Sequence, residues 1–420
     1  MLILFKNARI LSMQDDTIIF GELLVKDNRI EYVGEHCPIK EVDRIIDCEG
    51  NLLMPGFKNA HAHTAMVFAR SASDDLPLLD WLTKAIFPME ARFIEDDIYY
   101  LTKCGILEYL AGGITACSDM YFAVPELVRA SEEMGIRNVL IATSLKEPIS
   151  LLRERYCSLN KKDSLISYRL GIHAEYTTPK ERIVEIAKLA NELHAEVALH
   201  LGETEHEVQG CVDRYGMTPV KFLDSLGLFN YGGIAYHANF FTDEEIKICK
   251  DKNIKIVTCP ASNAKLASGI CPVSKYLDNG LTIGIGTDGA GSNNSLDMFK
   301  EMYLVSALQK LSYMDASKMD GFEVLKMATV GSAKVLGLND SDVLAKGKYA
   351  DIIMIDLANP AMQPLNNIAK SIVYSGSKDI VKMTMINGKI LYYDHKFYLK
   401  DNPLDIYAKA QEITDRLKRG

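Results

Sequence analysis

The chain has 420 residues, of which 48% are hydrophobic and 25% charged, a composition typical of a globular protein with a sizeable core and not of a disordered or collagen-like chain. Its 47 basic and 56 acidic residues give a net charge of −9, which argues against nonspecific nucleic-acid binding and favours a small, neutral or cationic substrate. The nine cysteines include no Cys-x-x-Cys pair, which argues against a zinc ribbon and predicts reduced thiols rather than a disulfide framework.

Both ends of the chain carry short apolar and β-branched runs that are separated by turn residues. These runs occupy residues 1–54 and return at 350–355, 372–373 and 381–391, where Asn387-Gly388 indicates a hairpin turn. We therefore expect residues 1–54 and 345–420 to pair into one small β-sandwich. Residues 55–344 would form a central domain inserted between the two parts.

The central region alternates buried-type strands with helical stretches. Eight such strands are expected, at residues 53–60, 114–118, 138–143, 169–173, 197–200, 233–237, 254–258 and 281–286. Eight strand and helix units over this length predict an α/β fold of the (β/α)8, TIM-like barrel type. The longest insertion follows the first strand, at residues 70–89, and contains the only tryptophan, Trp81, in a lid-like loop.

Five of the nine histidines fall at the ends of predicted barrel strands: His61, His63, His173, His200 and His237. In Asn59-Ala60-His61-Ala62-His63 the two imidazoles are two positions apart, so both point to the same side of the strand. Barrel enzymes build their sites where the carboxyl ends of the strands converge. His61, His63 and His200, together with Asp288 after the eighth strand, therefore predict a three-nitrogen, one-oxygen site for one divalent metal ion.

Each of these residues also has an ordinary structural interpretation. A single strand-end histidine is more often a satisfied polar residue than a ligand, and Asp288-Gly289 is a common turn pair. Glu203 follows Gly202 in a loop, where a solvated carboxylate is the usual finding. Five histidines at strand ends of one barrel favour the metal-site interpretation.

Several segments resemble the amidohydrolase superfamily, in its cytosine deaminase and chlorohydrolase-like branch. They are residues 55–63, 199–203, 236–238, 259–263 and 286–289. Within that superfamily, residues 75–82, 88–90, 119–121 and 289–295 look most like the 5′-methylthioadenosine/S-adenosylhomocysteine deaminases. One departure is Gly171-Ile172-His173, where the family normally has Gly-Pro-His.

The resemblance implies one catalytic Zn²⁺, or Fe²⁺ as in some relatives, held by His61, His63, His200 and Asp288. His237 would hydrogen-bond the hydroxide nucleophile. Asp288 would also act as the base, and Glu203 would deliver a proton to the ring nitrogen next to the reacting carbon. Glu90 would hold the ribose hydroxyls, and His173 would face the imidazole side of the purine. Arg153, Arg155 and Arg169 are candidates to bind an amino-acid tail.

The implied function is hydrolytic removal of the 6-amino group of an adenosine derivative, which yields ammonia and the inosine analogue. The 5′ substituent stays open among methylthio, homocysteinyl, hydrogen and hydroxyl. One alternative is an amidohydrolase or chlorohydrolase for a pterin, guanine, cytosine or triazine ring, and Lys146 after the third strand leaves a two-metal site open. A noncatalytic barrel with a structural metal is the alternative from another class.

The expected partner is a small nucleoside substrate, with neither nucleic acid nor membrane, and the resemblance implies a homo-oligomer. The apolar run at residues 2–5 is too short for a signal peptide. No apolar run approaches the ~20 residues of a membrane span. The sequence therefore predicts a cytoplasmic location.

Overall fold

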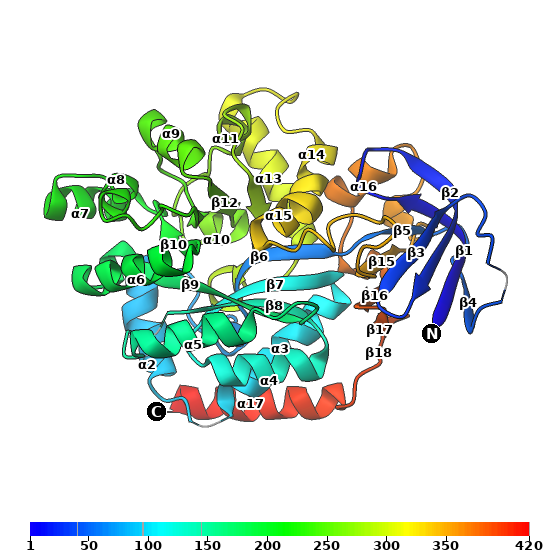
Figure 1. The fold of residues 1–420 in the computed structure, drawn as a ribbon, viewed down its shortest axis with the longest axis horizontal. Coiled ribbons are helices and arrows are strands. Elements are labelled where there is room, and N and C mark those ends of the chain that lie inside the picture. Colours follow the sequence, from blue (N-terminus) through cyan, green and yellow to red (C-terminus); the bar gives the residue numbers. More distant parts are fainter. Residues whose placement is uncertain (40, 95, 144, 420) are drawn as a thin grey trace.

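The computed structural model describes residues 1–39, 41–94, 96–143 and 145–419. It confirms an α/β fold that contains a parallel barrel and a second, largely antiparallel sheet (Figure 1). The barrel strands are, in spatial order, β6 (Phe57–His63), β7 (Ile114–Tyr121), β8 (Arg137–Ala142), β9 (Ile166–Ala174), β10 (Val197–Leu201), β11 (Gly233–His237), β12 (Ile254–Thr258), β13 (Ile283–Ile285) and β14 (Asp288–Gly289).

The first predicted strand, at residues 53–60, is wrong as one element, because the chain divides at Gly56. β5 (Leu52–Pro55) belongs to the second sheet, and β6 begins the barrel at Phe57. A Cβ on Gly56 would lie only 2.1 Å from Thr115 Cγ2, so a larger residue does not fit where the chain passes between the two sheets. The segment at residues 53–60 is therefore divided between two sheets.

The eighth barrel strand is also divided, and its two parts close the barrel. β13 pairs with β12, and β14 pairs with β6 in the register Asp288↔Ala62. Between them, Thr287 Oγ1 accepts a hydrogen bond from Asn59 Nδ2 at 2.7 Å, and the Thr287 backbone N–H donates to Asn59 Oδ1 at 2.9 Å. The last strand thus reaches both neighbours by changing partner, and Asp288 lies on the second part.

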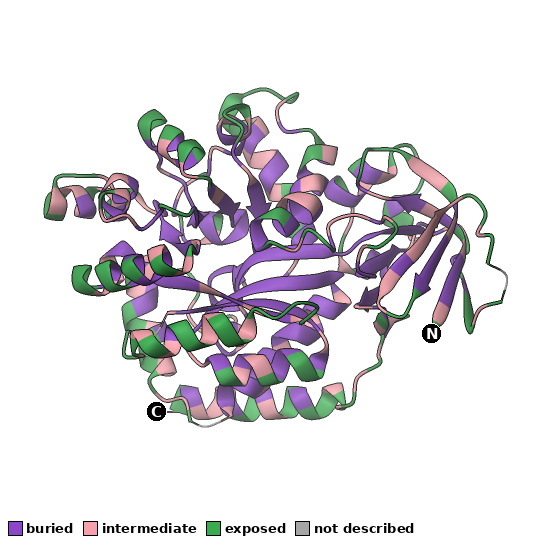
Figure 2. Ribbon diagram, viewed as in Figure 1, coloured by how far each residue is buried: buried purple, intermediate pink, exposed green. Residues whose placement is uncertain are grey.

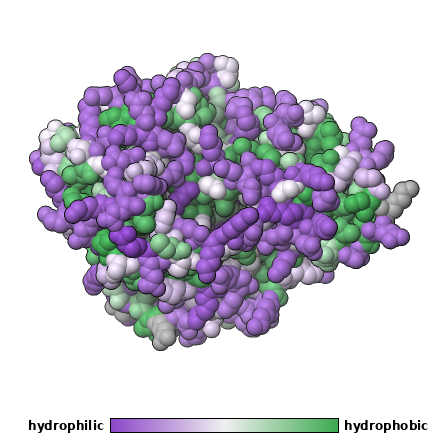
Figure 3. Space-filling model, in the orientation of Figure 1, coloured by the Kyte–Doolittle hydropathy of each residue, from purple (hydrophilic) through white to green (hydrophobic). Residues whose placement is uncertain are grey.

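Helices cover the outside of the barrel. They are α3 (Asp97–Ala111), α4 (Val124–Met134), α5 (Ile149–Leu159), α6 (Lys180–Leu193), α7 (Glu205–Tyr215), α8 (Pro219–Ser225), α9 (Asp243–Asp251), α10 (Pro260–Lys265), α11 (Val273–Asp278), α12 (Ala290–Asn293), α13 (Met298–Tyr313), α14 (Gly321–Lys326) and α15 (Ser332–Leu336). Figure 2 shows buried strands inside this ring and helices that are exposed on their outer faces. Figure 3 shows a mainly hydrophilic surface with small, separate hydrophobic areas.

The second sheet joins both ends of the chain, as expected for the small β-sandwich. Its strands are β1 (Leu2–Leu11), β2 (Ile18–Lys26), β3 (Arg29–Gly34), β4 (Arg44–Asp47), β5, β15 (Ile352–Ile355), β16 (Val381–Ile386), β17 (Lys389–Tyr393) and β18 (Lys396–Phe397). The antiparallel pairing of β5 with β15, which includes Leu53↔Met354, connects the N-terminal and C-terminal strands.

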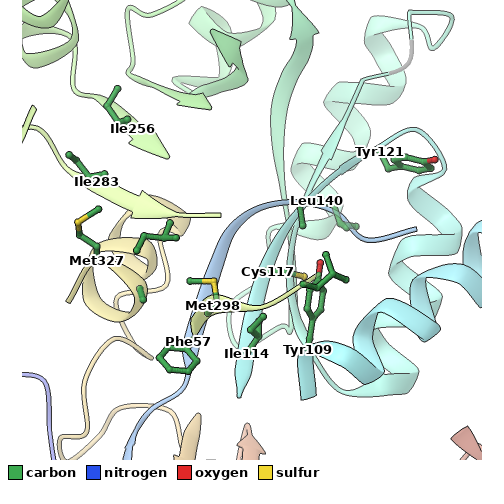
Figure 4. Packing of buried hydrophobic residues seen from close by; sticks show 14 of the residues in the cluster. Phe57, Tyr109, Ile114, Cys117, Tyr121, Leu140, Ile256, Ile283, Met298 and Met327 are labelled. Carbon is green, nitrogen blue, oxygen red and sulfur yellow. The ribbon is translucent and has the colours of Figure 1, made fainter. Parts of the chain in front are cut away.

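Alternation along these strands gives the sheet two buried faces. Leu53 and Met354 belong to the separate core of this sheet, whereas their neighbours Met54 and Ile353 join the large cluster of the barrel and its helices. Figure 4 shows part of that cluster, where Phe57, Tyr109 and Ile114 lie close to one another. The second sheet is therefore anchored to the barrel through its apolar side chains.

Two C-terminal segments are helical. The pair Ile372 and Val373, expected in a β-type run, lies in α16 (Ile368–Tyr374), so that expectation is wrong; both side chains are buried among other helices. The last helix, α17 (Pro403–Arg419), lies along α3 (Figure 1) and buries Ile406, Ala410, Ile413 and Leu417, which recur on one helical face. Among the residues described, no helix combines the length and apolarity needed to cross a lipid bilayer.

After η1 (Thr64–Ala69), the predicted lid-like insertion contains short helices: α1 (Leu78–Asp80), the π-helical turn η2 (Trp81–Ile86) and α2 (Phe87–Glu90), which ends one residue beyond it. Trp81 and Ile86 are buried, which ties the segment to the barrel. The insertion therefore forms one wall of the space above the barrel mouth.

Candidate functional site

Four side chains meet at the carboxyl ends of the barrel strands. His61 and His63 come from β6, His200 from β10 and Asp288 from β14, and one ligand atom of each lies within 4.8 Å of all the others. His63 Nε2 lies 3.3 Å from His200 Nε2 and 3.2 Å from Asp288 Oδ1. Within the described residues this is the one His, Cys, Asp and Glu group of this kind, so the chain offers a site for a single metal ion.

The hydrogen bonds of the imidazoles fit metal binding. His63 Nδ1 lies 2.6 Å from the Met120 carbonyl and His200 Nδ1 lies 2.7 Å from the His173 carbonyl. A carbonyl only accepts, so both Nδ1 atoms carry the proton and both Nε2 atoms keep a free lone pair. Within the described chain, neither ring nitrogen of the fully buried His61 has a hydrogen-bond partner. A metal ion would provide a partner for one of these two buried nitrogens.

Burial keeps two of the imidazoles in the neutral state that binds metal. It lowers the pKa of His61 to about 3 and holds the pKa of His200 well below its ordinary value, so both imidazoles are neutral. Burial opposes ionisation of Asp288, but the neighbouring His61 and His63 outweigh it and hold the Asp288 pKa well below its usual range. Burial opposes protonation of His63, but its contacts with Asp288 and the Met120 carbonyl outweigh it and raise the pKa of His63. Three imidazoles and one carboxylate are a ligand set suited to zinc-type ions.

The Asp288 carboxylate is held in one orientation. Its Oδ2 accepts hydrogen bonds from the Ser262 hydroxyl at 2.6 Å and the Ser292 hydroxyl at 2.7 Å. Its Oδ1 is thereby turned toward His61 and His63, at 3.4 and 3.2 Å. The backbone of Asp288 has φ +57, a left-handed conformation that is rare for this residue and that the surrounding contacts maintain.

Glu203 is fully enclosed at the edge of the group. The Glu207 carboxylate of α7 accepts hydrogen bonds from the backbone N–H groups of Gly202 and Glu203, both at 2.8 Å, and so fixes the loop. Glu203 Oε1 accepts a hydrogen bond from the Ser268 hydroxyl at 3.2 Å, and Oε2 lies 4.0 Å from His237 Nε2. Burial raises the pKa of the Glu203 carboxyl, which favours its protonated form.

A chain of amides links Glu203 with His237 and determines which nitrogen of His237 carries the proton. Asn239 Nδ2 donates to the Glu203 carbonyl at 2.8 Å, and Asn263 Nδ2 donates to Asn239 Oδ1 at 2.9 Å. Asn263 Oδ1 then faces His237 Nδ1 at 2.7 Å. Because the Glu203 carbonyl only accepts, the whole chain has one direction, and Nδ1 of His237 must donate. The lone pair of His237 therefore lies on Nε2, the atom that faces Glu203.

The four clustered side chains, His61, His63, His200 and Asp288, are called the metal group. The last three of them line the floor of a cavity of about 490 Å³. His63, His200, His237, Glu203 and Asp288 line it, together with His173 and Glu90. Glu90 Oε1 accepts a hydrogen bond from the Tyr121 hydroxyl at 2.6 Å, and His173 Nδ1 lies 2.9 Å from Thr177 Oγ1. All the predicted substrate-facing residues thus lie around one space, with the insertion on its outer side.

Other predicted candidates lie elsewhere. Arg153, Arg155 and Arg169 do not line this cavity, and neither does the exposed Lys146. Arg169 lines a separate hollow, beside Arg137, the first residue of β8. Lys146 therefore offers no bridging ligand to the metal group.

The sequence reasoning missed the residues that orient the site: Asn239, Asn263, Ser262, Ser292 and Glu207. Three of them lie in the segments 259–263 and 289–295, which carried the family resemblance. Their position in those segments was an available signal, although only the fold shows which side chain each one contacts.

The chain is similar to known proteins along nearly all of its length. Residues 52–391 match the amidohydrolase family. A 5-methylthioadenosine/S-adenosylhomocysteine deaminase of Caldanaerobacter subterraneus subsp. tengcongensis is 36% identical, and the match covers 100% of this chain and 99% of that protein. A 5′-deoxyadenosine deaminase of Methanobrevibacter smithii is also 36% identical, covering 99% of this chain and 98% of that protein.

A solved structure agrees in fold and contains bound zinc. An adenosine deaminase from Xanthomonas campestris with bound zinc superimposes with a TM-score of 0.94 at 30% identity, covering 100% of this chain and 99% of that one. The family match extends from β5 to β17 and so includes all four ligands of the metal group. The barrel, its buried ligand set and these similarities together show that the chain belongs to the amidohydrolase family.

Proposed function

We propose that this protein is a metal-dependent hydrolase that removes the 6-amino group of an adenosine derivative and releases ammonia and the inosine analogue. The observation that carries the proposal is the meeting of the metal group, Glu203 and His237 in one enclosed cavity. The names of the relatives, which are deaminases of adenosine derivatives, support this substrate class.

We propose Zn²⁺ as the ion, held by His61, His63, His200 and Asp288. The ligand set supports this choice, as does the zinc in the similar solved structure. A divalent ion here would supply activation of water for attack at neutral pH. The imidazoles that hold it are kept in the ligand tautomer by backbone carbonyls, as described above.

We assign the proton transfers to three side chains. Glu203, whose carboxyl pKa is raised by burial, would donate a proton to the ring nitrogen beside the reacting carbon. Asp288 would take the proton of the attacking water and pass it to the leaving amine. The free lone pair of His237 Nε2 would accept a hydrogen bond from that water. When the amine leaves, the proton of the added hydroxyl group would return to Glu203, so the product is neutral and both carboxyl groups regain their starting states.

We assign substrate positioning to Glu90 and His173. Glu90 has one oxygen occupied by Tyr121, so the other is available to a ribose hydroxyl. Burial lowers the pKa of His173 to about 4, so the neutral ring can face the imidazole part of a purine. We also propose that residues 1–54 with 345–420, and residues 55–344, are the two domains, with α17 lying against the barrel domain.

Ammonia release from adenosine derivatives tests the proposal. Purified protein with one zinc per chain should deaminate at least one of 5′-methylthioadenosine, 5′-deoxyadenosine, adenosine and S-adenosylhomocysteine. Guanine, cytosine, pterin and triazine substrates serve as competitors, and a preference for one of them would replace this proposal with the alternative heterocycle. No turnover of any of these compounds by metal-loaded protein would favour a structural metal.

A further inference from the structure

The cavity has two chemically different ends. Its floor carries imidazoles and the carboxylates of Glu203 and Asp288, whereas its outer wall is apolar. That wall consists of Leu78, Trp81, Leu82, Ile86 and Phe87 from the insertion and Leu145 from the loop after β8. Phe87 is 44% exposed and Leu145 is 48% exposed, so these two side chains form an apolar rim where the cavity opens to solvent.

The described lining contains no lysine or arginine. Arg155 lies 2.7 Å from Glu147, and Lys84, on the insertion itself, lies 2.9 Å from Asp80. Lys146 follows the rim residue Leu145 but is exposed and does not line the cavity. Arg153 pairs with Glu192, and Arg169 donates to the Val335 carbonyl. Glu90 also lines the cavity and lies on the same short helix as the rim residue Phe87. A negatively charged group at the outer end would therefore meet apolar surface and a carboxylate.

Resting on the proposed function, we infer that the outer wall is the subsite for the 5′ substituent and that it selects small, uncharged groups. Glu90 ends the helix that begins with Phe87, and Phe87 and Ile86 also line the cavity, so we place the 5′ carbon of a ribose held by Glu90 against these two side chains. A methylthio group or hydrogen gains apolar contact there. The carboxylate of a homocysteinyl tail finds no cationic partner, and that lack disfavours S-adenosylhomocysteine.

A comparison of four substrates tests the inference. The value of kcat/KM should be highest for 5′-methylthioadenosine, with 5′-deoxyadenosine next and adenosine below it. The value for S-adenosylhomocysteine should be lower than that for 5′-methylthioadenosine by about 100-fold. Equal values for these two, within threefold, would overturn the inference and leave the deaminase proposal intact. Failure to deaminate all four substrates would instead overturn the proposed function.

A charged substitution at the rim sharpens the test. Leu145→Arg should raise kcat/KM for S-adenosylhomocysteine about tenfold and lower it for 5′-methylthioadenosine, because it supplies the missing cation and removes apolar contact. The control is Leu79→Arg, since Leu79 is 54% exposed but does not line the cavity. An equal change for both substrates in Leu145→Arg would contradict the assigned subsite.

Discussion

The two ends of the barrel differ in whether some of their buried polar groups have partners within the chain. At the amino end, Lys58 Nζ donates to the Gly56 carbonyl at 2.9 Å and to Thr115 Oγ1 at 2.8 Å. There Arg137 Nε also meets Asp351 at 2.5 Å, with both side chains almost fully buried. At the carboxyl end, the described contacts leave both ring nitrogens of His61 without a hydrogen bond.

This difference separates residues that stabilise the fold from residues that act on a ligand. A buried charged side chain that is paired with another residue of the same chain needs no ligand, and removing its partner lowers the stability of the fold. A buried nitrogen without a partner is costly unless something else occupies the position. The amino end therefore holds the two sheets together, and the carboxyl end is prepared for an ion and a substrate.

The largest effect should follow from removing a metal ligand. His63→Ala should reduce bound zinc from one per chain to a small fraction and lower kcat/KM by about 10⁴-fold, because water is no longer activated. Metal content by mass spectrometry and ammonia release measure the two effects. His206→Ala, on the exposed face of α7, is the matched control. Full activity of His63→Ala would contradict the proposed difference between the amino and carboxyl ends of the barrel.

Glu203→Gln should lower kcat by about 10³-fold while zinc stays at one per chain, because glutamine keeps the shape but cannot donate an acidic proton. Glu205→Gln, two residues later and exposed, should retain activity. Loss of zinc in Glu203→Gln would mean that the residue supports the metal site instead of transferring a proton.

At the amino end, Arg137→Met should lower the free energy of unfolding by about 3–5 kcal/mol, because Asp351 is left as an uncompensated buried charge. Urea unfolding measures this change, and kcat of the folded variant should stay within about twofold of the original. Arg153→Met removes an exposed ion pair and should cost less than about 1 kcal/mol. A large drop in kcat for Arg137→Met would contradict the division of roles.

The smallest effect is expected for Asn263→Ala, which breaks the amide chain to His237. The variant should lose about 30-fold in kcat, a typical result for a residue that orients a site. In metal-free protein, ¹⁵N shifts of labelled histidine should show that the proton on His237 Nδ1 is redistributed to Nε2. Asn230→Ala, at an exposed position, is the control. Unchanged histidine shifts would show that the amide chain does not set the tautomer.

Much of the fold could be predicted from sequence because a parallel barrel has a local pattern. Six of the eight expected strands match single strands closely, and strand-end histidines converge in any such barrel. The division at Gly56 could not be predicted, since Leu53, Met54 and Phe57 are apolar and the chain is extended on both sides of the glycine. Ile372 and Val373 misled because β-branched residues favour strands, whereas tertiary burial holds them in α16.

The ligand set was predicted from the sequence, but the hydrogen bonds that orient it were not. His61 and His63 share a face by simple alternation, and Asp288 follows a strand. The partners of Asp288 and His237 are different: Ser262, Ser292 and Asn263 lie on helices that bring them to the site only through tertiary packing. The proposed domain boundary and residue roles stay predictions until they are tested.

The change of partner in the last barrel strand links the metal site to the order in which the chain is made. His61 and His63 lie on the first barrel strand to leave the ribosome, and Asp288 lies on the last. Since β14 pairs with β6 itself, Asp288 reaches His61 and His63 only when the barrel closes. A nascent chain that stops before residue 288 can present three imidazoles but no carboxylate from Asp288. The four-residue group is thus complete only in the closed barrel.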